Sequence, residues 1–224
     1  MVKQILTSLT ILATAVFVFG CESETAKRLS NGVLSNTSII SEEQPTITEI
    51  PSEPIRKLLE SGNEQTKVTL NYTQDYFTIP YPNGDVPKET GACTDVVIRA
   101  FRNAGIDLQK EVHEDMRANF GEYPKKWGLT KTDTNIDHRR VPNLQKYFTR
   151  KGKSLPVTDD AAKFKPGDVV SWDLNGKGMT HIGLISNLRE PNSGRYLIIH
   201  NIGSGTKIED RLFEWTITGH FRYF

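Results

Sequence analysis

The stretch that decides the fold of this chain is Gly91-Ala92-Cys93-Thr94-Asp95-Val96-Val97-Ile98-Arg99-Ala100-Phe101. Counted from Cys93, the apolar positions of this stretch and Ala104 recur at i, i+3, i+4, i+7, i+8 and i+11. This is the period of an α-helix with one apolar face, and Gly105 is suited to end it. The sequence therefore predicts a buried helix over residues 93–104.

Cys93 lies at the start of this helix, where its chemistry can be altered. Thr90 is the expected N-cap, which would make Cys93 the third helical residue. Unpaired N–H groups and the helix dipole favour a thiolate at that position. Cys93 is therefore a candidate nucleophile. The alternative is a free cysteine that packs with Val96 and Val97 in the core.

The N-terminus has the pattern of an exported lipoprotein. Lys3 precedes a largely apolar run that ends at Val18-Phe19-Gly20-Cys21. We expect residues 1–20 to be a signal peptide and Cys21 to carry lipid, the alternative being an ordinary secretory signal. Residues 21–54 are polar and lack a period, which predicts a flexible tether before one domain over residues 55–224. The expected location is the cell envelope, anchored to a membrane through the lipid and facing the periplasm or the outside.

The composition limits the classes of function. The chain has 224 residues, 37% hydrophobic and 25% charged, which suits one globular domain. Removing residues 1–20 takes away only Lys3, so the formal charge falls from +1 to 0. Nucleic-acid binding needs many cations, so no nucleic-acid partner is expected.

Signals for secondary structure change type halfway along the chain. Helices are expected in the first half and short strands in the second. The expected helices cover residues 55–60, stopped by Gly62, then 93–104, 108–120 with Asp107 as cap, and about 142–152; a β-rich stretch covers 68–79. The expected strands cover residues 168–172, 180–186, 196–200 and 215–223. Helices followed by a run of strands predict an α+β fold with an antiparallel sheet.

Two histidines lie on neighbouring expected strands. If Ile185 pairs with Tyr196, His181 comes opposite His200. A slip of one residue would instead bring it opposite Asn201, and either side chain can orient an imidazole. The alternative is that these polar residues at strand ends simply face water.

At this point the motifs resemble known families. Cys93 at a helix start, then Phe164-Lys-Pro-Gly-Asp-Val-Val, then Thr180-His-Ile-Gly-Leu-Ile, resembles the NlpC-type cell-wall peptidases of the papain-like superfamily. The stretch from Tyr81 to Tyr223 more closely resembles the YijF-like family of exported bacterial proteins, a domain of unknown function. Its motifs here are Gly91-Ala-Cys-Thr-Asp-Val-Val-Ile-Arg-Ala, Asn135-Ile-Asp-His-Arg-Arg-Val-Pro-Asn-Leu, His200-Asn-Ile-Gly and Ile217-Thr-Gly-His-Phe-Arg.

The resemblance implies an NlpC-type, papain-like fold and a set of roles. It implies Cys93 as nucleophile, His181 as general base and later acid, and His200 as the orienting residue, with Asn201 as its substitute. The implied activity is hydrolysis of an amide in peptidoglycan stem peptides through a thioester, without metal or cofactor. The cell-wall enzymes usually have aspartate before the cysteine and serine after it, so recognition of a substrate amine does not carry over to Ala92 and Thr94.

Several charged residues are candidate substrate contacts. An arginine pair binds carboxylates well, and stem peptides carry several carboxylates. The candidates are Asp95, Asp137, His138, Arg139 and Arg140. A salt-bridged entry into the following helix is the alternative interpretation of residues 137–140.

Two other classes of function remain open. A zinc enzyme could use His181, His200 and His220, although no tight ligand pair such as His-Glu-x-x-His is present. The other alternative is a non-catalytic lipoprotein that binds a peptide or a partner on the same fold.

Overall fold

The structure is a computed structural model that describes residues 46–47 and 51–224. Its helices are α1 (Glu53–Val68), α2 (Cys93–Asn103), α3 (Leu108–Ala118) and α4 (Val141–Arg150), with short 3₁₀ helices η1 (Phe120–Glu122), η2 (Lys126–Gly128), η3 (Asp137–Arg139) and η4 (Ala161–Lys163). Its strands are β1 (Thr46–Ile47), β2 (Asn71–Tyr72), β3 (Thr90–Gly91), β4 (Ser154–Leu155), β5 (Val169–Asp173), β6 (Thr180–Arg189), β7 (Tyr196–Asn201), β8 (Thr206–Glu209) and β9 (Thr216–Phe221).

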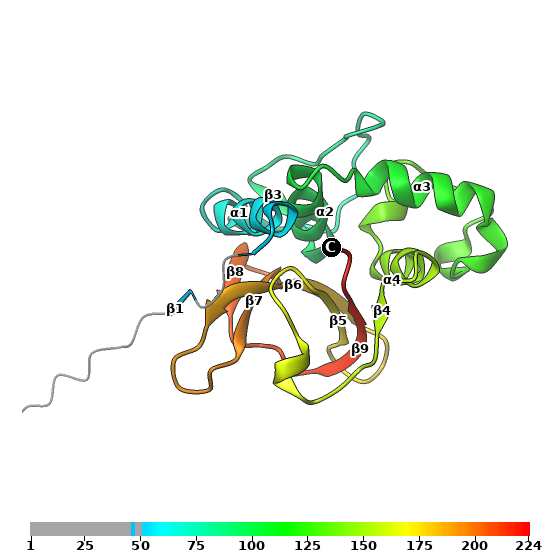
Figure 1. The fold of residues 1–224 in the computed structure, drawn as a ribbon. Coiled ribbons are helices and arrows are strands. Elements are labelled where there is room, and N and C mark those ends of the chain that lie inside the picture. Colours follow the sequence, from blue (N-terminus) through cyan, green and yellow to red (C-terminus); the bar gives the residue numbers. More distant parts are fainter. Residues whose placement is uncertain (1–45, 48–50) are drawn as a thin grey trace, which may run out of the picture. The chain divides into compact units, whose positions relative to one another are not determined.

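The main sheet follows the order β4-β9-β5-β6-β7-β8, and β1 pairs with the far end of β6. Every pairing in this sheet is antiparallel. The two short strands β2 and β3 form a separate parallel pair. Figure 1 shows the four α-helices gathered on one side of the curved sheet. The predicted α+β class and antiparallel sheet are confirmed.

Successive residues of the strands face two different cores. Ile182, Leu184 and Ile199 pack with the helices, in the same cluster as Cys93. Their chain neighbours face the other side of the sheet, in a second cluster formed by Phe164, Val170, Trp172, Ile185, Tyr196, Ile198 and Leu212. Since side chains alternate along a strand, a shift of one position along the chain moves a side chain from one core to the other.

The first helix is longer than expected. The prediction that Gly62 stops it was wrong, because α1 runs from Glu53 to Val68, beyond the predicted domain start at residue 55. A Cβ at position 62 would lie 2.8 Å from Cδ1 of Ile199. Gly62 therefore allows α1 to approach β7 closely, and packing outweighs the modest helix propensity of glycine.

The start of the cysteine helix also differs from the prediction. Thr90 is not the N-cap, because it lies in β3. Ala92 holds that position and has no side chain to cap with, while the Asp95 carboxylate accepts a 2.6 Å hydrogen bond from its N–H. Cys93 is therefore the first residue of α2 and not the third.

The expected β-rich stretch over residues 68–79 reduces to Asn71–Tyr72. Val68 ends α1, and the rest of the stretch has no strand beside it. Conversely, β8 was missed, because only Ile208 in it is a large apolar residue. The last helix and the last strand end at Arg150 and Phe221, two residues earlier than predicted.

Candidate functional site

Cys93 lines a cavity of about 350 Å³ at the start of α2. The residue is only 5% exposed, so a small part of its surface reaches the cavity. The other lining residues come from the 72–76 segment, the starts of α2 and α4, the loop around Trp127 and the first residue of β6: Tyr72, Gln74, Tyr76, Ala92, Thr94, Trp127, Ile136, Arg139, Arg140, Val141, Pro142 and Thr180.

The chain before Cys93 is held from two sides. In the parallel pair, Tyr72 is the partner of Gly91. The buried Asn201 side chain donates hydrogen bonds to the carbonyls of Asn71 (3.1 Å) and Gly91 (2.9 Å). Asn201 therefore ties the two short strands together beside the thiol, and within the described residues its side chain is not hydrogen-bonded to His181.

The environment of the thiol has opposing effects on its acidity. Burial is the strongest and raises the pKa of Cys93 to about 12. The backbone N–H of Ile182 opposes this rise, as do those of Thr94 and Cys93 itself, while the charge of Asp95 adds to it. The free protein therefore holds a neutral thiol, surrounded by N–H donors suited to a negative sulfur or oxygen atom.

His181 and His200 are hydrogen-bonded to each other, with 2.8 Å between Nε2 of His181 and Nδ1 of His200. Both expected registers were wrong, because Ile185 pairs with Ile198 and not with Tyr196. The observed register differs by two residues from the one that pairs Ile185 with Tyr196, so His181 and His200 keep the shared face that this register predicts; it differs by one residue from the register that brings His181 opposite Asn201. His181 and His200 consequently meet as diagonal neighbours on one face of the sheet.

The hydrogen-bond chain continues to Glu209, a residue that the sequence did not indicate. His200 Nε2 lies 3.2 Å from Oε2 of Glu209. A carboxylate only accepts, so Nε2 of His200 carries the proton and its Nδ1 accepts from Nε2 of His181. This assignment of tautomers leaves Nδ1 of His181 as a bare lone pair, the form a general base requires.

The His181 ring is not hydrogen-bonded to the thiol. Within the described chain it contacts the rings of Trp172, Trp215 and His200, whereas Cys93 belongs to the cluster of Ile182. The thiol nevertheless lies at the N–H of Ile182, one residue away along the strand. The pairing between β6 and β7 begins at Leu184, beyond this point. The structure thus places Cys93 and His181 against opposite faces of β6: Cys93 packs with Ile182, and His181 packs with Trp172, its partner on β5.

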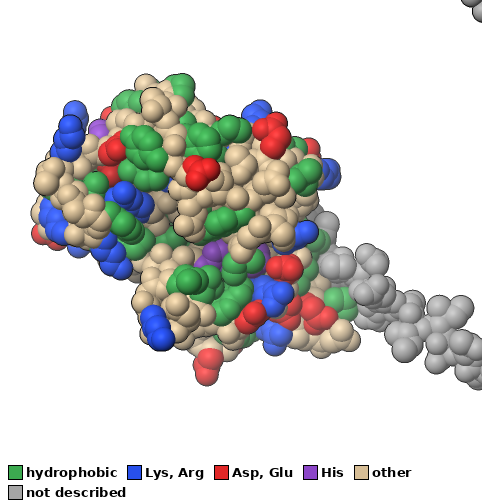
Figure 2. Space-filling view, turned by 180° about the vertical axis from the view of Figure 1, so that it is seen from behind, with side chains coloured by type: hydrophobic (Ala, Val, Ile, Leu, Met, Phe, Trp, Pro, Cys, Tyr) green, Lys and Arg blue, Asp and Glu red, His purple; other side chains and the backbone are tan. Residues whose placement is uncertain are grey.

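The histidines are neutral in this setting. Burial lowers the pKa of His181 to about 3, and the neighbouring His200 lowers it further. Burial also lowers the pKa of His200, against the opposing effect of Glu209. Figure 2 shows only small areas of histidine surface, and those near the middle of the view lie in a hollow.

Two of the predicted substrate contacts form an internal ion pair. Arg139 Nε lies 2.8 Å from Oδ1 of Asp95, and Nη2 lies 3.0 Å from Oδ2. Both side chains are almost fully buried, and Arg139 also donates to the carbonyl of Asp75 at 2.8 Å. The arrangement joins α2 to η3, and it occupies the groups that would bind a substrate.

Asp137 and His138 are buried and do not line the cavity. Asp137 Oδ2 accepts a 2.6 Å hydrogen bond from the N–H of Asp133. Burial raises the pKa of Asp137, while it lowers that of His138 to about 3. Together with the pair of Arg139, these contacts agree with the salt-bridged helix entry that was the alternative interpretation.

Arg140 differs from its neighbours. Its guanidinium carbon lies 4.2 Å from the ring centroid of Trp127, and both residues line the cavity of Cys93. In the described part of the chain, Nη1 of Arg140 is buried without a hydrogen-bond partner. Of the predicted substrate contacts, Arg140 is the one with charge to offer a ligand.

Tyr72 is a cavity residue that sequence reasoning missed. Its hydroxyl accepts a hydrogen bond from Gln74. Burial raises the pKa of Tyr72, and the nearby Cys93 raises it further. No motif marks Tyr72, because its position depends on the pairing with Gly91 across 19 residues.

His220 belongs to a separate cluster. Its Nε2 lies 2.7 Å from Oδ2 of Asp168, and its ring stacks on Phe164 at 4.3 Å. Arg222 completes the cluster with bonds of 2.7 Å to each Asp168 oxygen. His220 therefore does not join His181 and His200, and among the described residues no group of three potential ligands could hold a metal.

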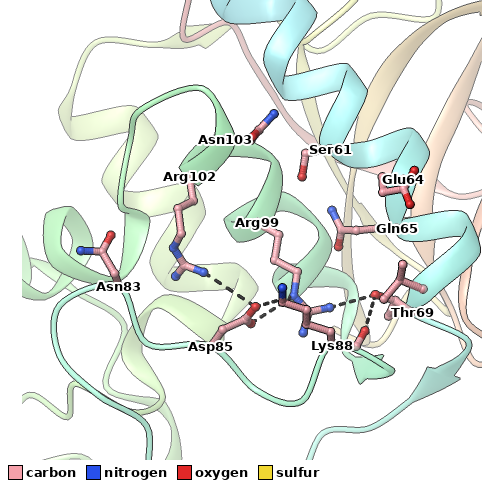
Figure 3. A pocket seen from close by; sticks show the side chains of 11 residues that line it. Ser61, Glu64, Gln65, Thr69, Asn83, Asp85, Lys88, Arg99, Arg102 and Asn103 are labelled. Carbon is pink, nitrogen blue, oxygen red and sulfur yellow. Dashed lines mark hydrogen bonds and ion pairs between the residues drawn. The ribbon is translucent and has the colours of Figure 1, made fainter.

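A second cavity, of about 470 Å³ and so larger than that of Cys93, lies between α1 and α2 (Figure 3). There Arg99 donates to both oxygens of Asp85, to the Thr69 hydroxyl, and to the carbonyls of Val86, Pro87 and Thr90. Arg102 donates to the carbonyl of Gly84 at 2.9 Å and lies 3.8 Å from Asp85. These bonds fix the segment that leads to Cys93.

The predicted signal peptide, the lipid-bearing Cys21 and most of the tether lie outside the described residues. Thr46–Ile47, within the predicted tether, pairs with Leu188 and Arg189 of β6. In the part of the chain that the structure covers, no helix is long and apolar enough to cross a membrane.

Comparisons with other proteins agree with part of the resemblance. Residues 59–223 match the family described as "Domain of unknown function (DUF1287)". The Escherichia coli (strain K12) protein described as "Uncharacterized protein YijF" is 47% identical over 180 residues, which cover 80% of this chain and 87% of that protein. No solved structure matches the chain.

Proposed function

The chain belongs to the DUF1287 family and is similar to the Escherichia coli protein YijF, and we propose that it is a cysteine hydrolase of the cell envelope. The proposed reaction is cleavage of an amide bond in a peptidoglycan stem peptide. The proposed fold relationship is to the NlpC-type, papain-like peptidases. It is supported by the order of cysteine helix, histidine strand and second histidine strand.

One observation carries the proposal. Cys93 lies at the first turn of α2, lines a cavity, and has backbone N–H groups from two elements directed at its sulfur. Such donors stabilise the negative oxygen of a tetrahedral intermediate as well as a thiolate. A cysteine that served packing alone would not require a cavity at its sulfur.

The reaction conserves atoms and protons in two steps. The Cys93 sulfur attacks the amide carbon as its proton passes to Nδ1 of His181, and the C–N bond then breaks as His181 returns that proton to the leaving amine. Water, activated by the same nitrogen, next hydrolyses the thioester and releases a carboxylic acid. His200 and Glu209 hold His181 in the required tautomer throughout.

Because His181 packs on Trp172, on the face of β6 opposite to Cys93, the mechanism requires the His181 ring to move in the substrate complex so that its Nδ1 reaches the sulfur. The free protein has a neutral thiol and a neutral imidazole, so proton transfer accompanies attack and no thiolate is present beforehand. Hydrogen bonds of catalytic groups are often long in free enzymes and shorten on substrate binding.

The envelope location and the substrate rest on the sequence. The run Val18-Phe19-Gly20-Cys21 supports export and lipid attachment, and residues 21–54 supply the tether. A hydrolase held at a membrane acts on material nearby, which favours cell-wall peptides. No metal or cofactor enters the proposed reaction.

A binding lipoprotein is the second candidate. The observations that favour it are the pKa of Cys93, about 12, and the missing hydrogen bond between Cys93 and His181 in the described residues. In that case the cavity would hold a peptide without cutting it.

The test is release of soluble peptides from purified peptidoglycan by the full-length protein, with mass analysis of the new termini. We expect new amine and carboxylate ends from the wild type, and a loss of about 10³-fold or more in Cys93→Ser and His181→Ala. Lys131→Met, an exposed change outside the cavity, serves as a folded control. Equal activity in wild type and Cys93→Ser would exclude Cys93 as the nucleophile.

A further inference from the structure

The cavity of Cys93 is positively charged on balance. Among its described lining residues are two arginines, Arg139 and Arg140, and no aspartate or glutamate. The charge of Arg139 is neutralised by Asp95 beneath the cavity. The net positive charge at the cavity therefore comes from Arg140.

Arg140 is a cation that has an aromatic partner and no anionic one among the described residues. In the described chain no carboxylate lies within ion-pair distance of Arg140, and its guanidinium lies over the Trp127 ring. Asp137 and Asp133 act on it only at longer range. A partly buried guanidinium without a carboxylate carries a desolvation cost that a bound anion would offset.

Two helix ends add to the positive potential. α2 and α4, of 11 and 10 residues, both begin at the cavity, where Cys93 and Val141 lie in its wall. The N-terminal end of each helix carries partial positive charge and unpaired N–H groups. Neither N-cap residue caps its helix with its own side chain, although in α2 the Asp95 carboxylate accepts a hydrogen bond from the N–H of Ala92.

The Trp127 ring gives this site a fixed geometry. Trp127 has φ 64°, a conformation rarely adopted by a bulky residue, and its side chain is 55% exposed. Stacking on Arg140 orients the guanidinium plane and leaves its edge for a planar ligand. A carboxylate is the planar anion that matches such an edge with two hydrogen bonds.

We propose that Arg140 binds a carboxylate of the substrate, so that the ligand of this cavity is an acidic peptide with a carboxylate near the amide that Cys93 attacks. The position of the amide rests on the proposed function, while the carboxylate site does not. Arg140 is thus a specificity residue, and Trp127 positions it.

Binding and cleavage are tested separately. The probe is a stem peptide released from purified peptidoglycan, compared with the same peptide after its carboxyl groups are converted to methyl amides. Affinity is measured by titration calorimetry with the full-length Cys93→Ala protein, which binds without turnover. We expect the methyl amide form to bind at least about tenfold more weakly, because a lost charged hydrogen bond changes affinity by that order.

Variants locate the effect. Arg140→Met should weaken binding of the free acid about tenfold or more and remove the preference for acid over amide, while Arg140→Lys should keep part of it. Lys131→Met removes the same charge from an exposed position and should change neither affinity. If the Cys93→Ala protein that keeps Arg140 binds the two peptides with equal affinity, or binds neither, the proposal is overturned. That result does not depend on how the Arg140 variants fold.

The outcomes separate the two proposals. Binding that depends on Arg140, without cleavage by the wild type, would retain the carboxylate site and reject the hydrolase. Cleavage of acid and amide forms with equal kcat/KM would retain the hydrolase and reject the carboxylate site.

Discussion

Two cavities of this protein are each lined by two arginines, and the two pairs differ in how many of their members have a carboxylate partner. Between α1 and α2, Arg99 and Arg102 both lie within ion-pair distance of Asp85. At Cys93, Arg139 has Asp95, but Arg140 has only an aromatic ring. The cavity between the helices is the larger of the two, about 470 against 350 Å³, yet both of its arginines already have a carboxylate within ion-pair distance.

The difference shows that volume does not identify the site. Arg99 uses its donors to hold the segment that precedes Cys93, so its cavity is part of the support for the other one (Figure 3). An arginine without an acidic partner beside a thiol is the arrangement that a ligand would complete.

The largest expected effect is a difference in the free energy of unfolding between variants of the neighbouring residues Arg139 and Arg140. Arg139→Met leaves Asp95 buried without its partner and should lower the free energy of unfolding by about 3–5 kcal/mol. Arg99→Met should also destabilise the fold, because it removes hydrogen bonds to Thr69 and to three backbone carbonyls, although Arg102 stays within ion-pair distance of Asp85. Arg140→Met loses only the contact with Trp127, so less than about 1 kcal/mol is expected. Urea denaturation of the three variants measures these free energies. Equal losses of stability in Arg139→Met and Arg140→Met would contradict the claim that only Arg139 has a buried carboxylate partner.

Acid should lower the free energy of unfolding, because the fold holds the buried histidines His138 and His181 in the neutral form. The folded pKa values of His138 and His181, about 3, lie below the unfolded value near 6.5, so the unfolded chain takes up protons first as the pH falls. Their contribution is complete above pH 6.5 and decreases below it by about 1.4 kcal/mol per pH unit for each histidine.

Unfolding free energies at pH 7, 6 and 5 measure this slope. His138→Leu removes one of the two groups and should make the slope shallower by about 1.4 kcal/mol per pH unit. No histidine lines the cavity between α1 and α2, so the residues of that cavity do not account for the pH dependence expected between pH 7 and 5. An unchanged slope in His138→Leu would contradict the assignment.

The smallest effect concerns Glu209, a positioning residue that acts through His200. Glu209→Gln can donate as well as accept, so it no longer imposes one tautomer on the two histidines. We expect kcat to fall about tenfold at little change in KM, with a shifted pH profile of kcat. A structural role alone would lower stability and leave the pH profile of the remaining activity in place.

Local patterns in the sequence predicted much of the fold. The apolar period after Cys93 defined α2, and the Asp107 side chain caps α3 as expected, accepting from the N–H of Gln109 at 3.1 Å. Such signals depend on residues a few positions apart. The length of α1 was not predictable, because Gly62 is explained by Ile199, which is far along the chain.

The site was predictable as a set of residues more than as a geometry. The motifs selected Cys93, His181 and His200, and the structure brings the two histidines together despite a register error of two. The partner of Arg139 and the freedom of Arg140 depend on how η3 packs on α2, which no local pattern encodes. Glu209 was missed because β8 itself was missed.

The most direct test of the account is intact-mass analysis of the protein quenched in acid during its first turnovers with purified peptidoglycan peptides. The account predicts an added mass equal to the acyl part of the substrate, located on the peptide that contains Cys93 and absent in Cys93→Ala. Cleavage products without any adduct, formed equally by Cys93→Ala, would contradict it.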